Sequence, residues 1–161
     1  MKLYLLRHGV AEDAAPGVLD AERSLTDDGR DKLAAVLRRA AEAGVCPDVI
    51  LTSPYARSLQ SAEMAKEALQ CPRDLVQDSH LTPHSDPDDA WKLLRDYRGF
   101  EQVMIVGHNP HLSWFAGVVI GAQGGGVEMK KGALACLQVG SLGAAPRGSL
   151  TWLLTPRLAG T

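Results

Sequence analysis

The chain has 161 residues, of which 45% are hydrophobic and 22% are charged, a balance that is typical of a soluble globular protein. This length predicts a single domain over residues 1–161, whose core can bury enough surface without disulfide or metal support. The net charge of −2, from 17 basic and 19 acidic side chains, excludes the broad basic field that general nucleic-acid binding requires.

The start of the chain predicts a buried strand, a long loop and a helix. Lys2–Leu6 is a short apolar run that is typical of a buried strand, whereas Gly9–Leu25 has no hydrophobic period and predicts a loop. Thr26 is a preferred N-cap residue, and the two acidic residues behind it suit the positive end of a helix dipole. Apolar residues then recur at helical spacing until Gly44, where we expect the helix to end.

A second strand and a second helix follow. Val49–Thr52 predicts the strand, and we expect Ser53 to cap the helix, with Pro54 at its first position. We expect that helix to extend to about Gln70. Leu75–Gln77 predicts a further short strand.

The same alternation continues along the chain. Ser79–Pro87 is a polar turn region, and apolar residues at helical spacing predict a third helix over residues 90–97. Gln102–Val106 predicts the next strand. Asn109 and Pro110 then repeat the pattern of a cap followed by proline, which predicts the start of a fourth helix.

The C-terminal part predicts antiparallel structure. We expect a flexible loop over Gly121–Gly126, and Ala133–Val139 and Ser149–Leu154 are typical of the two strands of a hairpin. Because strands and helices alternate over the rest of the chain, we expect an α/β fold of three layers. Its mostly parallel central sheet would have helices on both faces.

Polar side chains follow three of the predicted strands, at the points where the strands end. Arg7 and His8 end the first strand. Arg57 lies in the first turn of the helix behind the second strand, and His108 follows a later strand. Because ligands of open parallel α/β sheets bind outside the carboxyl ends of the strands, we expect these side chains to converge.

Such a set of arginines, histidines and helix N-termini forms a pocket for a dianionic oxyanion, of which phosphate is the common one. Guanidinium groups clamp phosphate oxygens in bidentate fashion, and helix N-termini add free N–H groups. The glycine-rich lysine motif of a P-loop is absent from the sequence, which argues against a P-loop nucleotide site.

These segments also resemble the signature motifs of a known family. Leu6-Arg7-His8-Gly9, the stretch Ser53–Ala62 and Val106–Pro110 are similar to three motifs of the histidine phosphatase superfamily, the phosphoglycerate mutase-like group. Arg23–Gly29 is similar to the arginine-containing helix entry of the same family. The short segment between Arg57 and His108 leaves little room for a lid over the site. In this respect the chain most resembles the SixA-type phosphohistidine phosphatases. The resemblance implies a phosphoglycerate mutase-like fold.

The resemblance also implies a covalent mechanism. His8 would be the nucleophile and would carry a phosphohistidine that water then hydrolyses. Arg7 and Arg57 would bind the phosphoryl oxygens, and His108 would donate a further N–H group. The residues expected to be catalytic are Arg7, His8, Arg57 and His108. Those expected to bind the substrate are Arg7, Arg23, Arg57, His108 and Asn109, although the position of Asn109 also favours a helix cap.

This chain lacks the general acid that the family pattern contains. Mutase-like members place a glutamate after the position of Leu81-Thr82, where this chain has Pro83. Alkyl phosphate hydrolysis needs an acid to protonate its poor leaving group, whereas the imidazole of phosphohistidine leaves once solvent protonates it. The substitution therefore favours a nitrogen–phosphorus substrate. His80, His84 and Asp86 are the candidates for a substitute acid.

We therefore expect a metal-independent phosphatase without a cofactor that removes phosphate from phosphohistidine on a protein such as a phosphotransfer domain. A small-molecule phosphomonoesterase of the same superfamily is the first alternative. The second is a phosphate-sensing module without turnover, which a histidine beside arginines disfavours. A zinc site of His8, His108 and His111 is a further alternative, but the flanking arginines would repel a cation.

The cysteine pattern and the absence of a long apolar run indicate the cellular location. The three cysteines lie far apart in the sequence, at Cys46, Cys71 and Cys136. Spacing of this kind is typical of reduced thiols, so we expect a cytoplasmic protein. No apolar run approaches the ~18 residues of a membrane span, and the first apolar run is too short for a signal peptide. No apolar seam is evident, and we expect a monomer.

Overall fold

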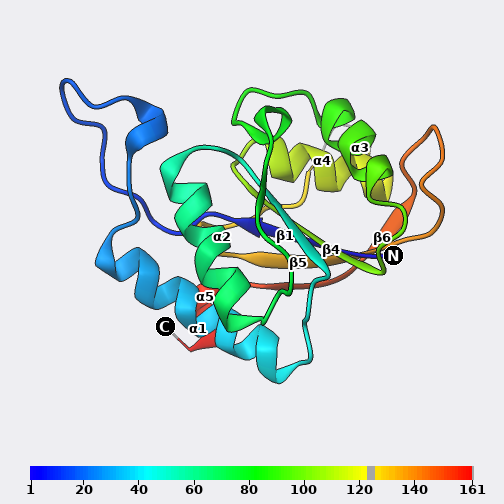
Figure 1. Ribbon diagram of the computed structural model, residues 1–161, viewed down its shortest axis with the longest axis horizontal. Coiled ribbons are helices and arrows are strands. Elements are labelled where there is room, and N and C mark those ends of the chain that lie inside the picture. The colour runs from blue at the N-terminus through cyan, green and yellow to red at the C-terminus, as the bar shows by residue number, and fades with distance from the viewer. Residues whose placement is uncertain (123–125, 161) are drawn as a thin grey trace.

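The computed structural model describes residues 1–122 and 126–160. A six-stranded sheet forms its centre, and helices cover both faces of the sheet (Figure 1). The strands are β1 (Lys2–Arg7), β2 (Val49–Thr52), β3 (Val76–Gln77), β4 (Gln102–Gly107), β5 (Leu134–Val139) and β6 (Gly148–Leu154). The helices are α1 (Asp27–Glu42), α2 (Ala56–Ala68), α3 (Pro87–Asp96), α4 (His111–Ile120) and α5 (Pro156–Ala159). Two short 3₁₀ helices are η1 (Asp20–Glu22) and η2 (Ser79–Leu81).

The strands are ordered β3-β2-β4-β1-β5-β6 across the sheet. Neighbouring strands from β3 to β1 run parallel, whereas β5 runs antiparallel to both β1 and β6. The mostly parallel sheet and the C-terminal antiparallel pair are therefore confirmed. The carboxyl ends of β1, β2 and β4 lie at one edge, which is where parallel sheets carry their ligand sites.

Alternation of side chains along the strands divides the core between the two faces of the sheet. Leu3 and Leu5 of β1 pack with α3 and α4, and the neighbouring Tyr4 and Leu6 pack with α1, α2 and α5. The same alternation holds in β4. Strands buried on both faces in this way are hydrophobic throughout, which explains the continuous apolar runs in the sequence.

The start of α1 is the one that the sequence predicts. The side chain of Thr26 caps α1 by accepting a hydrogen bond from the N–H of Gly29 at 3.0 Å. The helix ends at Glu42, and Gly44 follows with a φ of 77°, a left-handed conformation that glycine adopts without strain.

The predicted caps of α2 and α4 are wrong. The N-cap position of α2 is Tyr55, so Ser53 lies outside the helix and its fully buried side chain turns toward His108 instead. The N-cap position of α4 is Pro110. The side chain of Asn109 donates to the carbonyl of Met129 at 3.0 Å, so a tertiary partner has replaced the local cap.

Other differences are small. The loop expected over Gly9–Leu25 contains η1 and a bridge between Ala11 and Leu25. The turn region Ser79–Pro87 contains η2 and the first residue of α3. Residues 123–125 of the expected loop Gly121–Gly126 lie outside the described residues. Within the described part of the chain, no helix is both long enough and apolar enough to cross a membrane.

Candidate active site

A pocket of about 360 Å³ lies at the carboxyl ends of β1 and β4. It brings together every residue that the sequence predicts for the site, including Arg57 from the first turn of α2. Its lining residues are Arg7, His8, Ala11, Asp20, Arg23, Arg57, Pro83, His84, His108, Asn109 and Lys131. Segments far apart in the sequence therefore meet where the parallel strands end, as expected.

His8 is a buried, neutral imidazole with one unprotonated ring nitrogen. Its Nδ1 lies 2.7 Å from the carbonyl oxygen of Gly9, and because a carbonyl only accepts, Nδ1 carries the proton. The pKa of His8 is lowered to about 3, chiefly by burial and also by the charges of Arg57, Arg7 and Lys131, while the hydrogen bond to the Gly9 carbonyl opposes the shift. Nε2 therefore keeps its lone pair, and it accepts a hydrogen bond from Nε of Arg57 at 3.3 Å.

His108 faces His8, with their ring centroids 5.0 Å apart. Burial lowers the pKa of His108 to about 2, with smaller contributions from His8 and Arg57. Its Nε2 lies 2.9 Å from Ser53 Oγ and 3.2 Å from Ser58 Oγ. The two imidazoles are thus neutral neighbours, so they do not repel each other as cations.

The arginines are fixed by backbone and carboxylate acceptors. Arg7 donates from Nη1 to the carbonyl of Met129 at 2.7 Å, and burial lowers the pKa of its guanidinium. Arg57 is 4% exposed and donates from Nη2 to Asp20 Oδ2 at 2.9 Å. A guanidinium buried to this extent needs such a partner, because a buried charge without one is costly.

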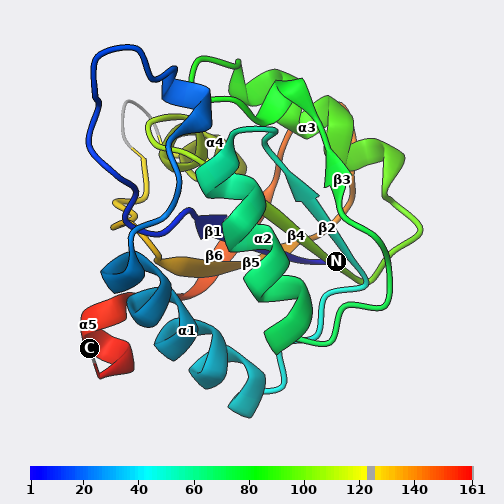
Figure 2. The same ribbon diagram turned by 60° about the vertical axis from the view of Figure 1, so that its left-hand side comes forward.

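Asp20 is a residue of the pocket that sequence reasoning missed. Its other carboxylate oxygen, Oδ1, accepts from Arg23 Nη2 at 2.7 Å and Nε at 2.9 Å, so one carboxylate bridges two arginines. Burial alone would raise the pKa of Asp20, but its hydrogen bonds to Arg57 and Arg23 lower it. Both ribbon views place η1, which carries Asp20, beside the first turn of α2 (Figures 1 and 2). The spacing of Asp20 and Arg23 is the only local signal for this contact.

The three candidate acids separate in space. His84 lines the pocket, whereas His80 pairs with Asp78 at 2.8 Å and lines a different hollow. Asp86 caps α3 by accepting from the N–H of Asp88 at 2.9 Å.

Lys131 is a second residue that the sequence alone does not assign to the site. In the structure Lys130 pairs with Glu128, while Lys131 lines the pocket, and its charge helps to lower the pKa of His8.

His111 does not join the other two histidines. It is fully buried and stacks on Phe115 with ring centroids 6.5 Å apart, and it does not line the pocket. Over residues 1–122 and 126–160, no group of three or more histidine, cysteine or acidic side chains is placed to hold a metal ion.

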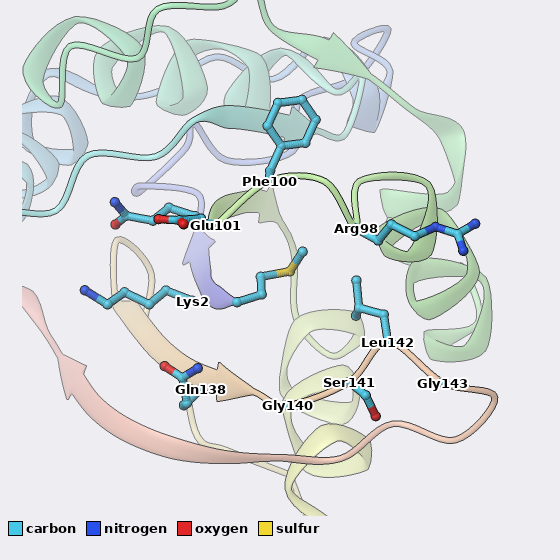
Figure 3. Close-up of a pocket in the computed structure, with 11 residues that line it drawn as sticks. Lys2, Arg98, Phe100, Glu101, Gln138, Gly140, Ser141, Leu142 and Gly143 are labelled. Atoms are coloured by element: carbon cyan, nitrogen blue, oxygen red, sulfur yellow. The ribbon is translucent and has the colours of Figure 1, made fainter.

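A larger hollow of about 660 Å³ lies at the opposite, amino end of β1 and β4 (Figure 3). Its charged side chains are on the surface, and those of Lys2 and Arg98 point away from each other (Figure 3). We therefore assign the candidate active site to the smaller pocket, which is lined by both imidazoles and guanidinium groups.

Comparison with known proteins relates the chain to one family. Residues 3–82 match the model of the histidine phosphatase superfamily (branch 1). An uncharacterized protein of Picosynechococcus sp. (strain PCC 7002) is 31% identical over 144 residues, which cover 88% of this chain and 87% of that protein.

Solved structures share the fold. The protein histidine phosphatase SixA complexed with tungstate matches with a TM-score of 0.88 and 22% identity, over 98% of each chain. A protein from Agrobacterium tumefaciens assigned as a phosphohistidine phosphatase SixA gives 0.82 and 28%, over 96% of this chain and 97% of that one. The sheet and its flanking helices thus form the expected phosphoglycerate mutase-like fold.

The fold and the motifs together define a hydrolase of the histidine phosphatase type. The chain belongs to the histidine phosphatase superfamily and is similar to the SixA proteins within it. The resemblance that its motifs predict is confirmed.

Proposed function

We propose that this protein is a phosphohistidine phosphatase that removes phosphate from phosphohistidine on a protein, through a covalent intermediate at His8. The observation that carries the proposal is the state of His8. Its imidazole is neutral, its Nδ1 donates its proton to the carbonyl of Gly9, and its unprotonated Nε2 accepts a hydrogen bond from the guanidinium group of Arg57. A nucleophile in this state needs no base to activate it.

The reaction has two steps. The lone pair of His8 Nε2 forms a bond to phosphorus while the bond from phosphorus to the substrate nitrogen breaks. The departing imidazole keeps that electron pair and takes a proton from solvent. Water then attacks phosphorus and loses a proton, while the bond between phosphorus and Nε2 of His8 breaks. Inorganic phosphate leaves, and the electron pair of the broken bond returns to Nε2.

The remaining side chains would bind and stabilise the transferred group. Arg7 and Arg57 would hold its oxygens and balance their charge in the transition state. His108 would add a neutral donor. Arg23 and Asn109 line the same pocket and would complete the binding set.

Two features support a nitrogen–phosphorus substrate. Asp20 is the carboxyl group of the pocket, and because the arginines lower its pKa, it is ionised and cannot donate a proton. Pro83 occupies the wall where mutase-like members of the family place a glutamate. A leaving group that solvent can protonate, such as imidazole, suits a pocket of this kind.

A small-molecule phosphomonoesterase is the second candidate, and the position of His84 favours it. Its imidazole lines the pocket and could protonate an alkoxide. The third candidate, a phosphate-sensing module without turnover, has no specific observation in its favour.

The two free buried thiols Cys71 and Cys136 and the exposed Cys46 support action in the cytoplasm, where thiols stay reduced. We place the protein there as a monomer. Its partner would be a phosphotransfer domain or another folded protein that carries phosphohistidine.

Substrate preference tests the proposal. Rates of phosphate release would be compared for a phosphohistidine protein, p-nitrophenyl phosphate and a sugar phosphate, each with and without EDTA. We expect the phosphohistidine protein to be the best substrate, with no loss of rate in EDTA. The His84→Ala variant serves as the matched control, because removal of an acid slows only the sugar phosphate, whose alkoxide is a poor leaving group.

A preference for the sugar phosphate, together with a loss of that activity in His84→Ala, would establish the second candidate instead. Binding of phosphate without turnover of any substrate would establish the third.

A further inference from the structure

The contacts of His108 with two serine hydroxyl groups are not explained by the roles above. Ser53 follows β2, and Ser58 lies in the first turn of α2, so the two hydroxyls reach the same ring nitrogen from different segments. Both serines are fully buried, and His108 is 1% exposed. The contacts are therefore shielded from solvent, where an unpaired hydroxyl would be costly.

The direction of these hydrogen bonds decides where the proton of His108 resides. A neutral imidazole has one N–H donor and one acceptor nitrogen. Ser53 Oγ accepts from the backbone N–H of Tyr55 at 3.4 Å, and among the described residues its own proton has no acceptor other than Nε2 of His108, so the hydroxyl donates to Nε2. A donated proton at Nε2 requires that the imidazole carries its own proton on Nδ1.

The other nitrogen of His108 is in the state that this assignment requires. Nδ1 is buried and has no hydrogen-bond partner among the residues that the structure describes. His108 lines the pocket together with Arg7 and Arg57. A buried N–H group without a partner is costly, so a bound phosphoryl oxygen that accepts from it would stabilise the complex, whereas a lone pair at this position would repel an anion.

We propose that Ser53 and Ser58 are positioning residues that hold His108 in the Nδ1–H tautomer, so that this N–H can donate to a phosphoryl oxygen. The assignment of that acceptor rests on the proposed function. The inference also gives a physical reason for hydroxyl groups at two fully buried positions.

Nitrogen NMR of the wild-type protein tests the tautomer directly. In protein labelled with ¹⁵N-histidine, long-range proton–nitrogen correlations distinguish a protonated ring nitrogen from an unprotonated one. The signals of His108 are identified by their loss in His108→Gln. We expect an unprotonated Nε2 and a protonated Nδ1 at neutral pH. A protonated Nε2 would overturn the proposal without any further variant.

The Ser53→Ala/Ser58→Ala double variant tests the role of the hydroxyls. We expect a mixture of tautomers and weaker binding of inorganic phosphate, measured by calorimetry. The dissociation constant should rise by the factor by which the Nδ1–H fraction falls, so a fall to about one fifth predicts about fivefold weaker binding. The matched control is Thr52→Val. Thr52 precedes Ser53, and its buried hydroxyl donates to the backbone carbonyl of Ser53 and not to His108.

Two results of the double variant would contradict the proposal. One is an unchanged Nδ1–H tautomer, and the other is a changed tautomer with unchanged phosphate affinity while thermal unfolding shows an intact fold. Neither measurement depends on turnover. If the phosphohistidine protein is not hydrolysed, the proposed function fails, while the tautomer and the phosphate affinity still decide this inference.

Discussion

The imidazole of His8 owes its neutral state to burial and to neighbouring cations, and this state affects stability. In the unfolded chain a histidine takes up a proton near its ordinary pKa of 6.5, whereas in the fold the pKa of His8 is lowered to about 3. The unfolded state therefore binds more protons between these values, so stability is complete above pH 6.5 and is lost as the pH falls toward 3.

A pH series of unfolding experiments measures this effect. In urea unfolding at pH 7, 6 and 5, we expect the free energy of unfolding to fall by up to about 1.4 kcal/mol per pH unit for each such imidazole. The variant His8→Asn keeps an N–H donor for the Gly9 carbonyl but does not titrate, so its slope should be smaller by that amount. His80→Asn, which replaces an exposed imidazole, is the control. An equal slope in wild type and His8→Asn would contradict the assigned pKa.

Residues of the site differ in how far the sequence predicts them. Arg7, His8, Arg57 and His108 were predictable because each lies just beyond a strand, and parallel strands bring their carboxyl ends together. Asp20 and Lys131 were not, because each lies in a segment between the strands and α-helices whose path depends on tertiary contacts. The spacing of Asp20 and Arg23 signals their local pair but not the contact of Asp20 with Arg57.

At the scale of the element, the close approach of α1 to the loop after β1 explains why Gly29 lies inside a helix. A Cβ atom at Gly29 would lie 2.1 Å from the backbone oxygen of Val10, a distance that no side chain tolerates. The N–H of Thr26 also donates to Val10 O at 3.0 Å, so this contact fixes the start of α1 against the loop that leads from His8.

The Gly29→Ala variant should therefore destabilise the protein, although alanine normally stabilises a helix by ~1 kcal/mol relative to glycine. We expect a loss of about 1–3 kcal/mol in the free energy of unfolding, because the loop must move away from the helix. Gly99→Ala is the control, since a Cβ there meets nothing within 4 Å. Stabilisation by Gly29→Ala, measured by urea unfolding, would show that the close approach is not rigid.

The elements also show where local rules fail. The capping rule correctly predicts Thr26, whose hydroxyl oxygen accepts from the N–H of Gly29 while its proton is donated to the carbonyl of Val10, so its tertiary contact does not compete with the cap. The same rule fails at Ser53 and Asn109, because His108 and the carbonyl of Met129 compete for their polar atoms. Asn109 lines the pocket, and Ser53 contacts His108, which also lines it, so both exceptions have tertiary partners that sequence patterns do not reveal.

For the whole molecule, the topology separates packing from chemistry. Apolar side chains fill both faces of the sheet, and charged and imidazole groups gather at the edge where β1, β2 and β4 end. The alternation of strands and helices was sufficient to predict this arrangement. The order of the strands was not predictable, because it depends on pairings between segments far apart in the chain.

The central claim of this account is that His8 carries the phosphoryl group during turnover. Mixing the protein with a ³²P-labelled phosphohistidine protein and stopping the reaction in alkaline detergent within milliseconds would trap that intermediate. The account predicts an alkali-stable, acid-labile label that peptide mapping places on His8, and no label and no turnover in His8→Asn. Full turnover by His8→Asn, or wild-type turnover with label only on another residue, would contradict it.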